Sequence, residues 1–316
     1  MVEQSRITLV RAPNPSALTL SGTNSYLIDC GNGEAICIDP GPPIERHVKA
    51  LIDTADAKHL KITWIVITHG HPDHAPAAAP LSGRTGAKIA AHRNLKAPHD
   101  RALRDGETLL VGDTELVAID APGHTFDHLV YLYPRERALF TGDTVLGEGT
   151  VVIAPPGGAM RAYQTTLARL LTEFPQVERI YGGHGEPVSD ASTKLREYIA
   201  HRELREAQII AELESEPRTI PQLITAIYAA TDSRLWPAAA RQMLAHLLAL
   251  ENEQKVQSRL LDRALTVEER AILAPDWSAS ASDDAEVVRA ELGTDSTPEL
   301  RLYELTGSTR KTTLPN

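Results

Sequence analysis

The feature that most constrains this chain is the sequence Thr-His-Gly-His-Pro-Asp-His at residues 68–74. It follows residues 64–67, an apolar run with β-branched side chains that predicts a buried strand. Three imidazoles and the carboxylate of Asp73 therefore share one short turn, and Pro72 is typical of a helix start. A hydrophobic core has no use for such a cluster, whereas neutral imidazole and carboxylate are standard ligands of zinc and similar ions. The segment predicts a metal site at the end of a strand, followed by a helix over residues 73–81.

Three further residues complete the ligand set. His124, Asp143 and His184 each lie in a Gly-containing turn after a strand-like segment, which is where a rigid scaffold presents functional side chains. The competing interpretation is a polar loop in which histidines cluster by chance. The downstream residues make that the weaker interpretation, because together with the first motif they supply enough ligands for two metal ions.

Together these motifs resemble those of the metallo-β-lactamase superfamily of two-metal hydrolases. Within that superfamily the chain is similar to the β-lactamase-like protein 2 group, through residues 23–27, 38–41, 142–150 and 201–206. The resemblance extends over residues 5–273. It implies an αββα sandwich of two sheets with helices outside, which the alternation of strand-like and helical segments also predicts.

The resemblance implies a ligand assignment for two divalent metal ions. The first ion would be held by His69, His71 and His124. The second would be held by Asp73, His74 and His184. Asp143 would bridge them, and Asp73 and Asp143 are the expected catalytic carboxylates. Zinc is the expected metal, with Mn or Fe as alternatives, because His and carboxylate ligation permits all three.

Two polar residues are expected next to the ligands. Asp39 ends a strand before a Pro-Gly turn. It either accepts backbone hydrogen bonds in that turn or, as the resemblance implies, lies beneath the site and orients a ligand, since a carboxylate bonded to a His N–H fixes its tautomer. Asn24 is open between turn chemistry and the edge of the site.

The resemblance implies hydrolysis by a hydroxide shared between two metal ions, which lower the pKa of water from ~15.7 to near neutrality. Two divalent ions, two carboxylates and one hydroxide leave a charge of about +1, which favours an anionic or polarised substrate. The leading hypothesis is a phosphodiesterase or endoribonuclease acting on single-stranded RNA. The enzyme alternatives are a glyoxalase II-like thioester hydrolase, with Arg202 and Arg205 as candidate substrate-binding cations, and a β-lactam or lactone hydrolase. The non-enzyme alternative is a metal-binding scaffold.

The composition of the chain limits which binding partners and which cellular location are expected. The formal net charge of -10 over 316 residues gives no global attraction to nucleic acid or to an anionic membrane. No stretch approaches the ~20 apolar residues of a membrane span, and the N-terminal residues show no apolar signal core. Cys30 and Cys37 are expected to be reduced thiols. We therefore expect a cytoplasmic enzyme.

Three regions are expected along the chain. Residues 1–188 are predicted to be the catalytic domain. Residues 189–273 change to long apolar-striped helices followed by a short strand, which predicts a helical, winged-helix-like domain. Residues 274–316 are rich in Ser, Thr, Asp and Ala and are expected to be a partly disordered polar tail, with a strand at residues 300–305.

A winged-helix domain suggests binding to nucleic acid. Residues 189–273 carry 11 basic and 13 acidic side chains, so no basic footprint for duplex DNA is visible. A lid or a homodimerisation module is the favoured interpretation.

The remaining histidines near the motifs are not expected to bind metal. His92 and His99 have no partners at ligand spacing and are predicted to lie at the surface. His128 would lie about 13 Å from His124 if both were on one strand, at ~3.3 Å per residue. It is therefore predicted to be structural.

Overall fold

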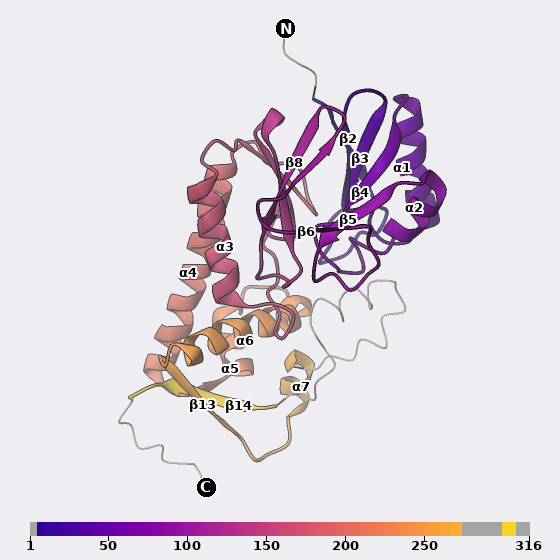
Figure 1. Cartoon of the computed structure of the whole chain (residues 1–316). Coiled ribbons are helices and arrows are strands. Elements are labelled where there is room, and N and C mark those ends of the chain that lie inside the picture. The colour runs from indigo at the N-terminus through magenta and orange to yellow at the C-terminus, as the bar shows by residue number, and fades with distance from the viewer. Residues whose placement is uncertain (1–4, 274–298, 308–316) are drawn as a thin grey trace.

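A computed structural model describes residues 5–273 and 299–307 of the chain. Two β-sheets stand face to face, with helices outside both, and a smaller domain lies below them (Figure 1). The first sheet has the order β1-β2-β3-β4-β5-β6, with β1 (Ile7–Arg11), β2 (Asn24–Asp29), β3 (Glu34–Ile38), β4 (Lys61–Val66), β5 (Lys88–His92) and β6 (Arg101–Leu103). The second has the order β11-β10-β9-β8-β7, with β7 (Thr108–Val111), β8 (Thr114–Asp120), β9 (Leu129–Tyr133), β10 (Ala138–Gly142) and β11 (Arg179–Gly182). The predicted αββα sandwich is confirmed.

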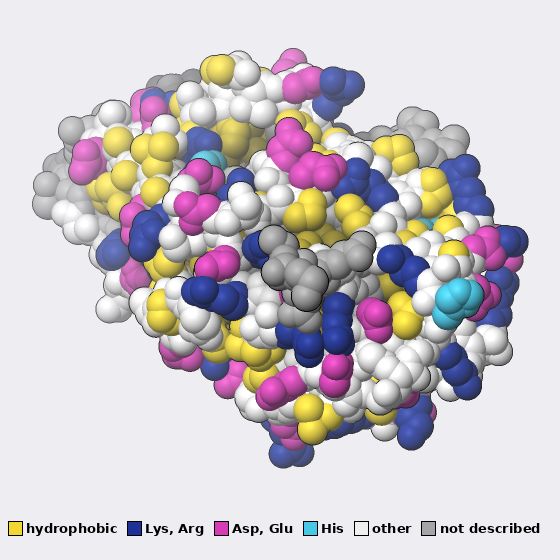
Figure 2. All heavy atoms as spheres, turned by 90° about the horizontal axis from the view of Figure 1, so that it is seen from above, with side chains coloured by type: hydrophobic (Ala, Val, Ile, Leu, Met, Phe, Trp, Pro, Cys, Tyr) yellow, Lys and Arg dark blue, Asp and Glu magenta, His cyan; other side chains and the backbone are white. Residues whose placement is uncertain are grey.

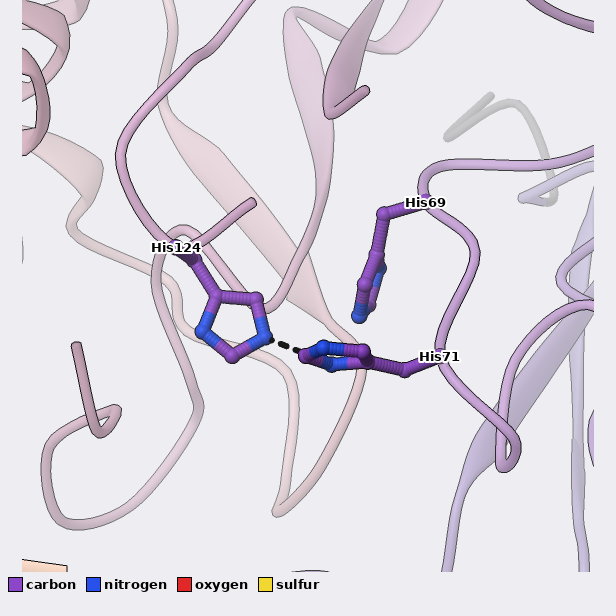
Figure 3. Close-up of side chains that lie close together, drawn as sticks. All are labelled: His69, His71 and His124. Carbon is purple, nitrogen blue, oxygen red and sulfur yellow. Dashed lines mark hydrogen bonds between the residues drawn. The ribbon is translucent and has the colours of Figure 1, made fainter. Parts of the chain in front are cut away.

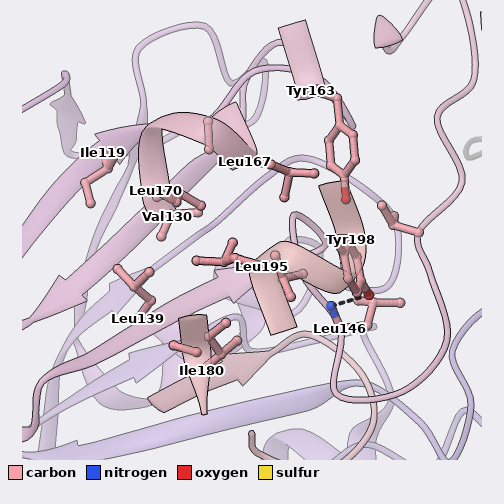
Figure 4. Packing of buried hydrophobic residues seen from close by; sticks show 14 of the residues in the cluster. Ile119, Val130, Leu139, Leu146, Tyr163, Leu167, Leu170, Ile180, Leu195 and Tyr198 are labelled. Atoms are coloured by element: carbon pink, nitrogen blue, oxygen red, sulfur yellow. Dashed lines mark hydrogen bonds between the residues drawn. The ribbon is translucent and has the colours of Figure 1, made fainter. Parts of the chain in front are cut away.

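Each sheet is buried on both faces, because alternate side chains of a strand point to opposite sides. In β2, Leu27 packs with the core beneath α1 (Glu45–Ala57) and α2 (Ala78–Thr85). Its neighbours Tyr26 and Ile28 belong to the core between the two sheets. A third core joins the second sheet to α3 (Met160–Glu173) and α4 (Ala191–Ser215). There the hydroxyl of Tyr198 accepts a hydrogen bond from the backbone N–H of Leu146 at 2.9 Å (Figure 4).

Strand direction brings the functional turns to one edge of the sandwich. Strands β3 and β4 are parallel, so their carboxyl ends meet. In the second sheet β8 and β10 are each antiparallel to β9, and β11 is parallel to β10, so these three also end together. A bridge between Thr23 and His184 joins the two sheets at this edge. Ligands in such turns rest on rigid strands.

The C-terminal domain is a winged helix, as predicted. Its elements are β12 (Arg218–Thr219), α5 (Ile220–Ile227), a 3-10 turn (Ser233–Leu235), α6 (Trp236–Asn252), β13 (Val256–Leu260), α7 (Val267–Leu273) and β14 (Arg301–Leu305). The Thr219 hydroxyl and the Gln222 side chain form a reciprocal capping box that starts α5. The strand expected near residues 300–305 is β14, which lies between β12 and β13 and buries Tyr303. The expected disorder of the tail concerns residues 274–298 and 308–316, outside the described residues.

The helix expected over residues 73–81 is wrong in its first half. Residues 72–77 form turns, and α2 begins at Ala78. The reason is that a neighbouring loop takes two of the backbone groups that a helix would use: Gly41 N–H donates to the His74 carbonyl, and Ala77 N–H donates to the Gly41 carbonyl, both at 3.0 Å. The turn is thereby tied to the end of β3.

The prediction that His92 lies at the surface is also wrong. Strand β5 continues through His92, whose side chain is buried with Nε2 3.6 Å from Asp120 Oδ1. His99 is partly exposed. Both cysteines are buried free thiols. No helix in the described part of the chain combines the length and the apolarity needed to cross a membrane.

Candidate metal centre

All seven predicted ligands meet at the edge where the strands end. His69, His71, Asp73 and His74 come from the turn after β4, and the others come from the turns after β8, β10 and β11. Figure 3 shows the rings of His69, His71 and His124 converging. His124 Nε2 and His71 Nδ1 lie 3.0 Å apart. Within each of three trios the ligand atoms lie within 4.8 Å of one another: His69, His71 and His124; His69, His74 and Asp143; Asp73, His74 and His184.

The donor atoms at the centre of this cluster fit metal ions. Several are buried and have no hydrogen-bond partner among the described residues: His69 Nε2, His74 Nε2, both carboxylate oxygens of Asp73, and Asp143 Oδ1. Buried polar atoms are normally paired, because an unmade hydrogen bond costs the full desolvation of the group. Nitrogen and carboxylate oxygen are the donors that Zn, Mn and Fe accept. The residues therefore fit divalent cations.

The electrostatics of the cluster also favour positive charge. Burial, together with the neighbouring imidazoles, holds the pKa of His69 well below its usual range, so this ring is neutral. Burial opposes the charged form of His184 as well, but Asp143 and Asp73 raise its pKa to about 10. The two carboxylates thus attract a proton strongly, and a divalent cation would use the same field.

Asp39 lies directly beneath the ligands, at the end of β3. Its Oδ2 is 2.8 Å from His74 Nδ1 and accepts from Thr68 Oγ1 at 2.6 Å, and its Oδ1 accepts from the Thr68 backbone N–H at 2.7 Å. A carboxylate on Nδ1 turns Nε2 of His74 toward the other ligands. Thr68, whose Oγ1 also lies 3.0 Å from His69 Nδ1, was not singled out from the sequence, although it stands directly before the first ligand.

Asn24 secures the loop that carries His184. Its Nδ2 donates to the carbonyls of Gly182 and Gly185 at 3.1 and 2.7 Å. Between them Gly183 passes so close to the site that an added Cβ would lie 2.4 Å from Asp143 Oδ1 and 2.6 Å from His74 Cε1. A residue with any side chain would displace both groups, so the glycine is required by close approach.

His128 lies much nearer the site than the expected 13 Å spacing implies. The His124 and His128 rings are 6.2 Å apart, because residues 121–128 form turns and not a strand. The His128 ring stacks on His69 with 4.7 Å between centroids, and its Nε2 accepts from the Asp143 backbone N–H at 3.2 Å. His128 is outside the three trios and positions two of their members.

The two arginines considered as substrate-binding cations have other partners. Arg202 is fully buried on α4, where its guanidinium lies over the Tyr163 ring and Nη2 donates to the Val151 carbonyl at 2.8 Å. The next carbonyl, that of Val152, is 2.9 Å from His124 Nδ1. Arg205 lies over the Tyr228 ring. Arg202 therefore braces the segment that orients His124.

A cavity of about 290 Å³ adjoins the cluster. Asp143 lines it, together with the loop before β2, the segment after β10, and residues of the C-terminal domain. The candidate metal centre is thus reached between the two domains.

Comparisons with known proteins match both domains. The model of the metallo-beta-lactamase superfamily matches residues 18–184, and that of the beta-lactamase associated winged helix domain matches residues 219–260. The lactamase-like protein adaB of Aspergillus niger is 32% identical over 81% of this chain and 84% of that protein. The beta-lactamase-like protein 2 homolog of Caenorhabditis elegans is 34% identical over 80% of this chain and 83% of that protein.

Solved structures share the fold. A metallo-beta-lactamase family protein from Thermus thermophilus superposes with a TM-score of 0.68 at 23% identity, covering 80% of this chain and 96% of that one. A beta-lactamase domain protein from Burkholderia ambifaria gives a TM-score of 0.67 at 19% identity, covering 81% and 90%.

Proposed function

Because the chain belongs to the metallo-β-lactamase superfamily of metal-dependent hydrolases, we propose that it is a dinuclear hydrolase. We assign His69, His71 and His124 to one ion, Asp73, His74 and His184 to the other, and Asp143 to both. The observation that carries the proposal is the convergence of these seven side chains. Five of their donor atoms are buried and have no hydrogen-bond partner among the described residues: His69 Nε2, His74 Nε2, both carboxylate oxygens of Asp73, and Asp143 Oδ1.

When bound, two divalent ions would supply a water of lowered pKa and stabilisation of negative charge on the substrate. The chain's own residues prepare the site for this. Asp39 orients His74, and His128 holds the backbone of Asp143. Asp143 is the one of the seven proposed ligands that lines the cavity. We therefore place the reacting bond of the substrate beside this carboxylate. We propose Zn as the resident metal.

The substrate that this site supports best is compact. A long polyanion such as RNA needs several phosphate contacts from Lys and Arg, and the residues that line the cavity include neither type. Cleavage of single-stranded RNA, the leading hypothesis from the sequence, therefore ranks below hydrolysis of a small ester, thioester or lactone.

The test is metal analysis followed by turnover. We expect close to two ions per chain after reconstitution with Zn or Mn, and hydrolysis that a chelator abolishes. The substrates to compare are single-stranded RNA, S-lactoylglutathione, a lactone and nitrocefin. Asp143→Ala should keep the far-ultraviolet circular dichroism spectrum and lose roughly 100-fold or more in turnover, since even changes beside the ligands cost about 10–100-fold. Clearly fewer than one ion per chain would contradict the proposal, and two ions without turnover of any substrate would favour the scaffold alternative.

A further inference from the structure

We infer that the cavity beside Asp143 binds an uncharged, mainly apolar acyl arm of the substrate, so that the preferred substrates are carboxylic esters or thioesters carrying such an arm. The C-terminal domain supplies most of one wall of this pocket. The inference rests on the proposed hydrolase function and names its substrate class.

Three separate parts of the chain enclose the cavity. The loop before β2 contributes Ala17, Leu18 and Leu20, and residues 146–152 follow the bridging carboxylate along the chain. The third wall combines α4 with the C-terminal domain. It consists of His201 on α4 and, from the C-terminal domain, Tyr228, Thr231 and Leu235 between α5 and α6, and Ala238, Ala239 and Gln242 on α6. A substrate reacting beside Asp143 therefore extends toward the winged helix.

The chemistry of the walls is unfavourable for an anionic arm. Most lining side chains are apolar, and the charged ones are the carboxylates of Asp143 and Glu148. Asp143 belongs to the candidate metal centre. Along the rest of the walls a phosphate or carboxylate on the arm would therefore meet the carboxylate of Glu148, without the Lys or Arg that such anions require. His201 adds no positive charge near neutral pH, because burial lowers its pKa to about 4.

A few polar groups lie among the apolar ones. Gln242 is buried, and Thr231 and His201 are half-buried. An apolar pocket with a small number of polar groups is typical of small-molecule sites, where the apolar surface supplies affinity and the polar groups fix orientation. A carbonyl or hydroxyl on the arm matches this lining, and a string of nucleotides does not.

The volume sets the length of the arm. At about 30 Å³ for each water-sized group, 290 Å³ holds roughly ten non-hydrogen atoms. An octanoyl arm therefore fits inside. Each buried methylene should raise kcat/KM about fourfold, so octanoate should exceed butanoate on the order of 100-fold. The reaction is hydrolysis. For an ester the acyl C–O bond breaks, water adds, and a carboxylic acid and an alcohol are released; for a thioester the acyl C–S bond breaks and a thiol is released in place of the alcohol.

The experiment uses the full chain reconstituted with Zn and a series of 4-nitrophenyl esters: acetate, butanoate and octanoate. Bis(4-nitrophenyl) phosphate serves as a compact phosphodiester. Ala238→Phe places a ring in the cavity from α6, at a position outside the ligand set. The matched control is Ala264→Phe, at an exposed residue of the same domain. Binding of octanamide, measured by calorimetry, gives a readout without turnover.

We expect kcat/KM to rise with arm length in the wild type. Ala238→Phe should lower the octanoate-to-acetate ratio at least about 10-fold and abolish octanamide binding, and Ala264→Phe should do neither. Equal rates for all arms, preference for the phosphodiester, or octanamide binding that survives Ala238→Phe would overturn the inference and leave the hydrolase function standing. Octanamide binding that Ala238→Phe removes, without hydrolysis of any substrate, would support the pocket and overturn the hydrolase function instead.

Discussion

At the scale of single residues, Asp39 meets two requirements: a left-handed backbone and a side chain that accepts hydrogen bonds from two residues. Its backbone is left-handed, with φ of 46°, a conformation in which Asp and Asn are enriched. Its carboxylate accepts from Thr68 and His74 at once. An acceptor-only group is needed here, because every partner offers a hydrogen.

Asp39→Asn tests this role. Asn tolerates the left-handed backbone and has the same shape, but its amide NH₂ opposes one of the donors. We expect metal affinity to fall about 10–100-fold while the fold is retained, as measured by competition with a chromophoric chelator. Asp53→Asn, at an exposed carboxylate on α1, is the control. Unchanged affinity in Asp39→Asn would remove Asp39 from the site.

His47 predicts a pH dependence of stability. Its side chain is buried, its Nε2 lies 2.9 Å from Ser25 Oγ, and burial lowers its pKa from 6.5 to about 4. The unfolded chain therefore takes up a proton first as the pH falls. Stability that is present above pH 6.5 is lost between about pH 6.5 and pH 4, by about 2 kcal/mol at pH 5.

His47→Gln should remove this dependence. Urea unfolding at pH 7.5 and pH 5 should show that the wild type loses about 2 kcal/mol more than the variant. His99→Gln, at a partly exposed histidine, controls for a general effect of losing one imidazole. Parallel losses in wild type and His47→Gln would contradict the assignment.

The sequence was sufficient to predict the family and the convergence of the seven side chains, because their spacing relative to strand ends constrains where they can lie. It was insufficient for His128. That residue was placed by assuming that residues 124–128 form a strand, whereas backbone turns bring its ring against His69. Which histidine reaches a site depends on φ and ψ of a few loop residues, and these leave no periodic pattern.

At the scale of elements, the docking of α3 on the His124 loop depends on Gly123. Its φ is 146°, and an added Cβ would lie 2.3 Å from Tyr163 Cα on α3. The Gly123 carbonyl also accepts from the Ala159 backbone N–H, just before that helix, at 2.8 Å. The clash is with backbone, so only movement of the helix or of the ligand loop can relieve it.

Gly123→Ala should therefore lower the free energy of unfolding by about 1–3 kcal/mol more than Gly86→Ala. Gly86 also has a positive φ, of 74°, but an added Cβ there meets nothing within 4 Å, so the comparison isolates the steric clash. Chemical denaturation of both variants measures the difference. Equal losses would show that α3 accommodates the methyl group.

The start of α2 illustrates why element boundaries were harder to predict than elements. Pro72 and the spacing of the ligands favour a helix from residue 73, yet the helix begins five residues later. The competing partner is the Gly41 loop, which takes the backbone hydrogen bonds of His74 and Ala77. A tertiary contact of this kind is not visible in local sequence.

At the scale of the whole molecule, α6 is shared between the two domains. Ala245 and Ala249 belong to the core that also contains α3 and the second sheet, while Met243, Leu247 and Leu250 belong to the C-terminal core. Arg161 of α3 adds a polar link by pairing with Glu206 and Glu253. The helix that precedes the wing therefore packs against the catalytic domain.

This arrangement leads to a prediction about nucleic acid. A DNA-recognition helix must enter a groove of the duplex, and Lys or Arg side chains nearby must contact the phosphates. In α6 Arg241 is the one Lys or Arg among 17 residues. At the opposite end of the molecule, which Figure 2 shows, basic and acidic side chains lie interspersed. With a net charge of -10, we expect duplex DNA to bind no more tightly than ~10⁻⁴–10⁻⁶ M at physiological salt, which is the non-specific range.

The measurement is a fluorescence anisotropy titration of labelled duplex DNA and single-stranded RNA with the metal-loaded chain. At physiological ionic strength the Debye length is ~8 Å, so long-range attraction is screened and only direct contacts hold a duplex. Raising the salt should weaken any residual binding of either nucleic acid, because phosphate contacts release counterions. Nanomolar, sequence-dependent duplex binding would require α6 to leave the catalytic domain, since a groove cannot be read by a helix whose two faces are both buried. That outcome would show that α6 is a DNA-recognition helix and does not form a wall of the substrate pocket.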